Sequence, residues 1–144
     1  MPVRGEVVQR KLATIRQAVV QLRTQGDVTT DRLAADVMLR WAVERGLQVA
    51  AAAVFDAGNH ILAGEFSDPA DEYAHVPQRL AAHGVITSAT AARLQGLSGF
   101  RNVLVHEYAQ VDLGRLVEAL DHLDDFDAFV ADVDGWLARR EAGA

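Results

Sequence analysis

The sequence predicts an all-α protein, an antiparallel helical bundle of about five helices. Half of the 144 residues are hydrophobic, only 6% are aromatic and three are prolines, which is a composition typical of packed helices. Apolar residues recur at three- and four-residue steps, and no segment shows the alternation that marks a strand. A chain of this length can bury a substantial core without disulfides or metals, so we expect one domain over residues 1–144.

The first half of the chain predicts two long helices. Residues 3–24 place apolar side chains on one helical face, and the polar and glycine residues at 25–27 should end this helix. Asp27 or Thr30 can cap a second helix from about residue 31 to residue 64. Its stretch at residues 47–55 is nearly all apolar. We therefore expect this second helix to be buried on most sides.

The second half predicts three further helices. A turn at residues 67–69 ends in Pro69, which suits the first position of a short third helix, and Pro77 inside that helix predicts a kink or a late start. Thr87 can cap a fourth helix, whose apolar positions continue to Val105. Asp112 can cap a fifth, with one continuous apolar stripe over residues 113–137.

Composition excludes several classes of function. The chain has no cysteine, and its five histidines show none of the spacings of a zinc site, so we expect neither a metal nor another cofactor. A net charge of −6 argues against a broad basic surface for nucleic acid, and any RNA contact should be local. The N-terminus has no apolar signal core and no apolar run approaches about 20 residues, so we expect no membrane contact and a cytoplasmic location.

One segment concentrates the chemistry of the chain. Arg101, Asn102, His106 and Tyr108 lie within eight residues, directly after an apolar helical run. In a helix Asn102 and His106, four residues apart, share a face, and Arg101 and Tyr108, seven apart, also align closely. A capping histidine beside a surface arginine would be the ordinary explanation of one such pair. The added amide and phenol favour a functional site.

This segment resembles the signature of the HEPN superfamily, and within it the HepT-like toxins of MNT–HEPN toxin–antitoxin pairs. The signature Arg-x4-His-x-Tyr is met by Arg101, His106 and Tyr108, within the string Gly-Phe-Arg-Asn-Val-Leu-Val-His-Glu-Tyr at residues 99–108. The resemblance extends to residues 43–48, 59–62 and 84–86 and so covers most of the chain. Pro77 departs from it, because a bulky apolar residue is expected there.

The resemblance implies a homodimer with metal-independent endoribonuclease activity on RNA, for which tRNA and mRNA are two candidate targets. Arg101, Asn102 and His106 would be catalytic, and an MNT-type nucleotidyltransferase antitoxin would add AMP to Tyr108. Cleavage by the 2′-hydroxyl of RNA, which leaves a 2′,3′-cyclic phosphate, needs one group to accept a proton and another to donate one. Imidazole can do either near neutral pH. Because each chain has one motif histidine, a two-fold dimer would supply both.

A second hypothesis is a non-catalytic helical module that binds a nucleotidyltransferase and presents nucleotide or substrate to it. The acidic charge favours this module slightly, and the complete motif favours the toxin more. Outside the motif, we expect Arg45 and Gln48 to form hydrogen bonds within the bundle. Trp41 and Trp136 are expected to be core or dimer-interface anchors.

Overall fold

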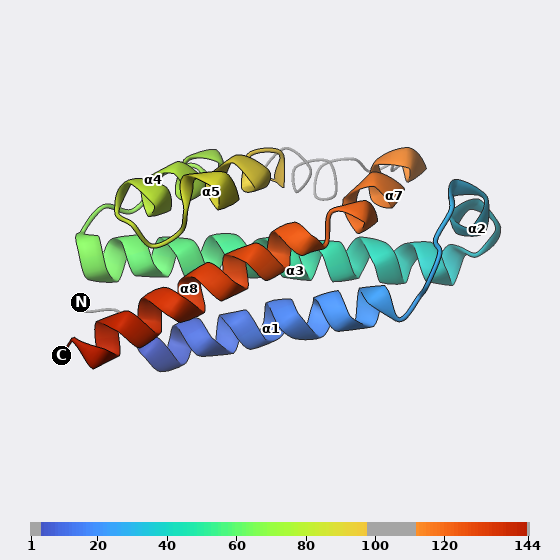
Figure 1. Ribbon diagram of the computed structural model, residues 1–144. Helices are drawn as coiled ribbons and strands as arrows, with labels where there is room; N and C mark the ends of the chain where they lie inside the picture. The colour runs from blue at the N-terminus through green and yellow to red at the C-terminus, as the bar shows by residue number, and fades with distance from the viewer. Residues whose placement is uncertain (1–3, 98–111, 144) are drawn as a thin grey trace.

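The computed structural model describes residues 4–97 and 112–143. One long helix, α3, runs through the centre, with α1 below it, α8 crossing beside both, and α4 and α5 above (Figure 1). Among the described residues every regular element is helical, so the all-α prediction is confirmed. The elements in chain order are α1 (Gly5–Arg23), α2 (Thr30–Ala35), α3 (Val37–Phe66), the 3-10 turn η1 (Tyr73–His75), α4 (Val76–Ala82), α5 (Ser88–Leu94), α7 (Leu113–Asp121) and α8 (Asp124–Ala142).

The core forms where α1, α3 and α8 meet. The predicted apolar face of α1 is confirmed, because Leu12 and Ile15 are completely buried. Phe55 of α3 and Phe129 of α8 are also fully buried in the same cluster. The helices α1 and α3 run antiparallel, because Lys11 lies 3.8 Å from Asp56, whereas Leu22, later in α1, packs against Gly46, earlier in α3. The prediction of an antiparallel bundle is therefore confirmed for these two helices.

The second predicted helix is two helices in the structure, separated by Asp36. The backbone of Asp36 is extended (φ −128°, ψ 96°), and its side chain accepts a hydrogen bond of 3.0 Å from the amide of Leu39. An aspartate that caps the following helix competes with the continuous helical hydrogen-bond pattern. The cap of α2 is Thr29, which accepts a hydrogen bond from the amide of Arg32. Neither Asp27 nor Thr30 has that role, so this part of the prediction is wrong.

The third predicted helix starts later than Pro69. Ser67 ends α3 in the left-handed conformation (φ 50°), and the α-helix begins only at Val76. Pro77 lies in the first turn of α4, where its missing N–H costs no helical hydrogen bond, and it is buried. The late start predicted from Pro77 is confirmed, while the opening of the helix at Pro69 is wrong.

Gly58 permits the close approach of α4 to α3. A Cβ atom at Gly58 would lie 2.6 Å from Cγ1 of Val76 and 2.9 Å from Cδ1 of Leu80. Both of these α4 side chains are buried. The absence of a side chain at Gly58 therefore sets the distance between the two helices.

The fifth predicted helix is also divided. Asp112 caps α7 as predicted, with its carboxylate 2.9 Å from the amide of Gly114. The helix stops at His122, whose backbone (φ −114°, ψ 25°) is not helical, and α8 begins at Asp124. Leu116 before the break and Phe126 after it both face the core. The apolar stripe is thus continuous although the helix is not.

Candidate functional site

The predicted site residues Arg101, Asn102, His106 and Tyr108 lie outside the described residues. The structure does place the elements on either side of this segment. Upstream is α5, whose cap is Thr87 as predicted, with the Thr87 hydroxyl accepting a hydrogen bond of 3.1 Å from the amide of Thr90. Downstream is α7. These two helices flank the predicted motif in the chain.

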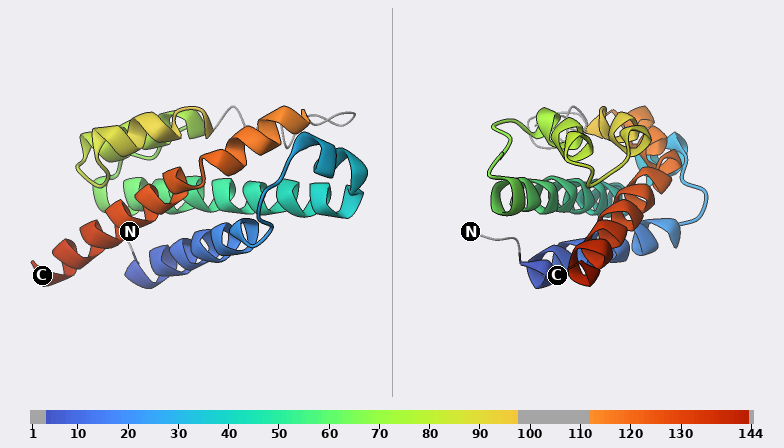
Figure 2. Two further views of the ribbon diagram at one scale, coloured as in Figure 1. Left: turned by 45° about the vertical axis from the view of Figure 1, so that its right-hand side comes forward. Right: turned by 60° about the vertical axis from the view of Figure 1, so that its left-hand side comes forward.

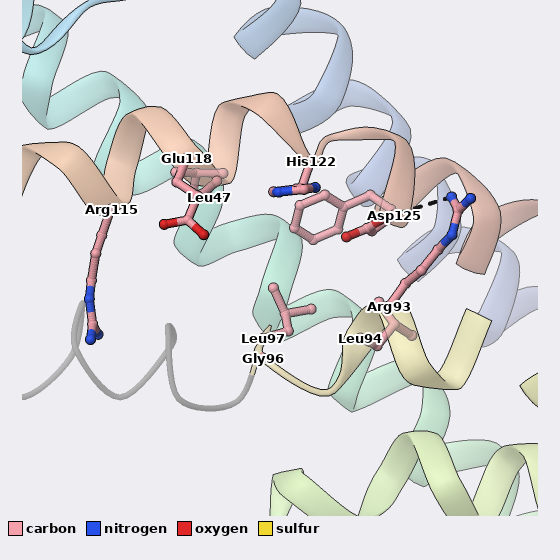
Figure 3. Close-up of a pocket in the computed structure, with 11 residues that line it drawn as sticks. Leu47, Arg93, Leu94, Gly96, Leu97, Arg115, Glu118, His122 and Asp125 are labelled. Atoms are coloured by element: carbon pink, nitrogen blue, oxygen red, sulfur yellow. Dashed lines mark ion pairs between the residues drawn. The ribbon is translucent and has the colours of Figure 1, made fainter. Parts of the chain in front are cut away.

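A pocket of about 400 Å³ lies between α5 and α7, over α3 and the first turn of α8 (Figure 3). Its apolar lining includes Leu47, Leu94 and Phe126, each at most 3% exposed. Pockets of this size accept small organic ligands. The two helices that bound the predicted motif in sequence thus form the walls of a single concave site.

The polar lining of this pocket contains charges of both signs. Figure 3 shows Arg115, Glu118 and His122 along α7 and the turn that follows it. Arg93 of α5 pairs with Asp125 of α8 at 3.7 Å across the pocket. Such a lining offers hydrogen-bond donors for phosphate or carbonyl oxygens and acceptors for amino groups. It is polar enough to orient a ligand without being strongly basic.

These pocket residues are absent from the sequence-based prediction. Residues 121–125 include three aspartates, a pattern typical of a solvated helical face, whereas His122 and Asp125 line the pocket. A signal was present, since Arg93 and Arg115 lie close to the motif in sequence on its two sides. In residues 4–97 and 112–143 we find no group of three histidine and carboxylate side chains placed to hold a metal ion.

A second polar cluster joins the ends of α3 and α4. The carboxylate of Asp68 accepts a hydrogen bond of 3.0 Å from Arg79 and lies 3.0 Å from Nε2 of His83. The His83 ring stacks on Phe66, with 4.1 Å between the ring centroids. The hydrogen bond with His83, aided by the charge of Arg79, lowers the pKa of the Asp68 carboxyl group. These contacts fix the connection between two helices, which is a structural role.

Two further predictions concern the polar pair Arg45 and Gln48 and the two tryptophans. The guanidinium of Arg45 donates a hydrogen bond of 3.2 Å to Gln48, as expected, although both lie on the surface of the bundle. Trp136 packs against the core, with its ring 6.1 Å from that of Phe66. Trp41 is 53% exposed and therefore is not a core residue. The role of Trp41 as a dimer-interface anchor stays a prediction.

The helical arrangement is that of the HEPN toxins, a class of all-α proteins. A family model described as ribonuclease HepT-like matches residues 9–133. The chain belongs to the HepT-like family, whose members include nucleases of toxin–antitoxin pairs. The resemblance identified in the sequence is thus confirmed. None of the helices in the described part of the chain combines the length and the apolarity needed to cross a membrane.

Individual relatives agree with this assignment. The mRNA nuclease HepT of Shewanella oneidensis is 27% identical over 135 residues, which cover 88% of this chain and 95% of that protein. A solved structure of the tri-AMPylated HEPN toxin of Shewanella oneidensis in complex with MNT antitoxin has a TM-score of 0.80 at 25% identity. It covers 92% of this chain and 99% of its own. The Bacillus subtilis protein YutE shares the fold, with a TM-score of 0.83 at 17% identity over 96% of this chain and 93% of that one.

Proposed function

We propose that this protein is a metal-independent endoribonuclease, the toxin of a toxin–antitoxin pair. The observation that carries the proposal is the complete Arg-x4-His-x-Tyr motif at residues 101–108, in a chain that matches the HepT-like family over residues 9–133. A named mRNA nuclease among its relatives supports RNA as the substrate. The chain acts as one HEPN-like domain, and the active form is a homodimer in which two motifs share one cleft.

The proposed reaction uses the 2′-hydroxyl of the substrate as nucleophile. His106 of one subunit accepts the 2′-hydroxyl proton as the oxygen attacks phosphorus, and the partner's His106 donates a proton to the departing 5′-oxygen. The products are a 2′,3′-cyclic phosphate and a free 5′-hydroxyl. Arg101 stabilises the negative charge that develops on the phosphoryl oxygens, and Asn102, four residues before His106 in the sequence, orients the imidazole.

Regulation would act through Tyr108. Its hydroxyl attacks the α-phosphorus of ATP, pyrophosphate leaves, and AMP remains attached as a phosphodiester. A partner must bring the ATP, because this chain has no glycine-rich phosphate loop. An MNT-type nucleotidyltransferase antitoxin fits this role, and the AMPylated Shewanella toxin seen with MNT antitoxin supports it. The attached phosphodiester would lie within reach of Arg101 and compete with RNA for the cleft.

The proposal is tested with purified protein and total RNA in the presence of EDTA. We expect cleavage to continue in EDTA, products that end in a cyclic phosphate, and a loss of about 10²–10⁴-fold in His106→Ala. His75→Ala is the matched control, because His75 is exposed in the 3-10 turn η1. Full activity of His106→Ala, or loss of cleavage in EDTA, would contradict the mechanism.

The antitoxin step has its own measurement. Co-expression with the nucleotidyltransferase should add about 329 Da per AMP to the toxin, and Tyr108→Phe should abolish this addition. An inhibited complex without added mass would show that binding alone neutralises the toxin.

The acidic net charge of −6 keeps one alternative open, a non-catalytic module that presents a nucleotide to its nucleotidyltransferase. This alternative predicts binding of the partner without RNA cleavage and without growth arrest on expression. Growth arrest that His106→Ala abolishes would exclude it.

A further inference from the structure

One face of α3, called the outer face here, points away from the core. It is formed by Met38, Trp41, Arg45, Ala52 and Asp56, together with Val49. In the right-hand view of Figure 2, α1 lies below α3, α4 and α5 lie above it and α8 lies to one side, so that no described helix covers the opposite side. Met38 is 69% exposed and Trp41 53% exposed. Large apolar side chains at such exposure on one helical face are typical of an interaction surface.

The shape of this face suits another helix. A shallow groove of about 250 Å³ runs between α1 and α3 and includes Arg45, Val49, Ala52 and Asp56 in its lining. Small side chains between two charged ones let a second helix approach closely, at the 8–10 Å typical of packed helices. Lys11 and Thr14 of α1 form the other wall of the groove.

The charges on this face determine how a second copy could pack. Arg45 and Asp56 lie on the same side of α3, three turns or about 16 Å apart. Asp56 also lies 3.8 Å from Lys11 of its own chain, and both side chains stay about half-exposed. If two copies of α3 packed in parallel, Arg45 would meet Arg45 and Asp56 would meet Asp56. If they pack antiparallel about an axis between residues 50 and 51, Arg45 faces the partner subunit's Asp56, and the two-fold symmetry repeats the pair.

We propose that the outer face of α3 packs antiparallel against the same face of a second copy of this chain, with each Arg45 paired to the partner subunit's Asp56. Val49 then faces the partner subunit's Ala52 at the centre, so small side chains meet where the helices are nearest. Such an isologous contact is self-complementary, as two-fold dimers require.

The same register explains the exposed apolar residues. Trp41 faces the partner subunit's His60, and Met38 faces the partner subunit's Ala63, near the end of the partner's α3. His60 is half-buried, and Ala63, one turn further along the partner's α3, is small and exposed. Together they leave room for the indole of Trp41. The pairing therefore covers both large apolar side chains, once at each end of the interface. Tryptophan in such a position commonly dominates the affinity of an interface.

This inference rests on the proposed function only in that the proposed site needs two chains. The dimer interface is tested without RNA, so the proposed interface and the proposed ribonuclease activity can fail separately. A dimer through another surface would overturn the interface and leave the composite site intact. An inactive protein with this interface would overturn the ribonuclease and leave the interface intact.

The chain has no native cysteine, so engineered cysteines report the register directly. Full-length chains carrying Arg45→Cys and differently tagged chains carrying Asp56→Cys are mixed, allowed to exchange and treated with bismaleimidoethane. We expect a covalent heterodimer in the mixture. Arg45→Cys alone should stay uncrosslinked, because two copies of residue 45 lie about 16 Å apart along the axis. Crosslinking of Arg45→Cys to itself, or none in the mixture, would overturn the antiparallel register.

Charge reversal tests the same pair in solution. Arg45→Asp and Asp56→Arg should each raise the dimer dissociation constant about tenfold or more, measured by analytical ultracentrifugation, because each places like charges opposite one another. The double variant should recover most of the affinity. Arg10→Asp, at an exposed position of α1, is the matched control. Equal dissociation constants for all four variants would refute the pairing, as would a wild-type chain that stays monomeric.

The aromatic anchor has a control of similar exposure. Trp41→Ala should weaken the dimer, whereas Val20→Ala, at a residue of α1 that is 55% exposed, should not. Circular dichroism confirms that each variant is folded before its association is measured. A dimer unaffected by Trp41→Ala would show that this face is not the interface.

Discussion

The carboxylate of Asp132 on α8 accepts a hydrogen bond of 3.0 Å from the backbone amide of Thr87, the residue that caps α5. The two residues are 45 positions apart in the sequence. This bond satisfies an amide at the start of a helix and ties that start to the longest helix of the C-terminal half. It fixes the upstream boundary of the segment that carries the predicted motif.

The first prediction concerns this cap. Thr87→Ala should lower the free energy of unfolding by about 1 kcal/mol, because the hydroxyl that accepts from the Thr90 amide is lost. Urea denaturation followed by circular dichroism measures the effect. Ser88→Ala, at an exposed neighbouring position inside the helix, should change the stability little. Equal effects in the two variants would show that the Thr87 cap contributes nothing.

The second prediction concerns the contact between α3 and α4. Gly58→Ala should destabilise the protein by about 1–3 kcal/mol, since the new methyl group would overlap Val76 and Leu80. Alanine has a higher helix propensity than glycine, so helix propensity alone would make Gly58→Ala stabilising. A loss of stability would therefore report the close packing at this position. Gly135→Ala is the control, because its Cβ would meet only the flexible guanidinium of Arg139 at 3.3 Å. If Gly58→Ala raises the melting temperature, α4 does not pack as described.

The third prediction concerns pH. The pKa of Asp68 is lowered in the folded state, so its contribution to stability is present above its unfolded pKa of about 3.9 and is lost as the pH falls through the folded value. Asp68→Asn should therefore be less stable than the wild type at pH 7. The difference should shrink as the pH falls below about 4. Asp71→Asn, at an exposed site in the same connection, is the control, and a difference independent of pH would contradict the assignment.

The fourth prediction concerns the proposed role of Arg101. Arg101→Lys keeps the charge but cannot present two parallel N–H groups to a phosphate, so RNA cleavage should fall about tenfold or more. Initial rates on a defined RNA measure the loss. Arg10→Lys on α1 should cleave at the wild-type rate. If Arg101→Lys also cleaves RNA at the wild-type rate, Arg101 provides only long-range attraction for the substrate.

The fold could be predicted from the sequence where the apolar spacing was decisive. The caps Thr87 and Asp112, the helix before residue 24 and the late start at Pro77 follow from local chemistry alone. The breaks at Asp36 and His122 could not be predicted, because apolar side chains continue on both sides of each break. Hydrophobic spacing shows which face is buried and does not show whether the backbone is continuous.

The candidate site, like the fold, could be predicted from the sequence only in part. The motif residues stand together in the sequence, and their types alone indicate phosphodiester chemistry. The pocket between the flanking helices needs α5, α7 and α8 to be assembled, so Arg93 and His122 have no sequence pattern that relates them. Nearness to the motif marks Arg93 and Arg115, but residues that meet only through tertiary packing leave no pattern that links them in the sequence.

The position of α8 has a consequence for synthesis of the protein on the ribosome. The helices α1 and α3 are complete once residue 66 has been made, yet Phe129 and Val133, which cover the core beside them, come from the last helix. A nascent chain therefore lacks part of the cover over this core until α8 has been made. Because Asp132 also holds the start of α5, the frame around the motif is finished only with the final helix. A chain released before α8 is made would lack the bond that holds the start of α5.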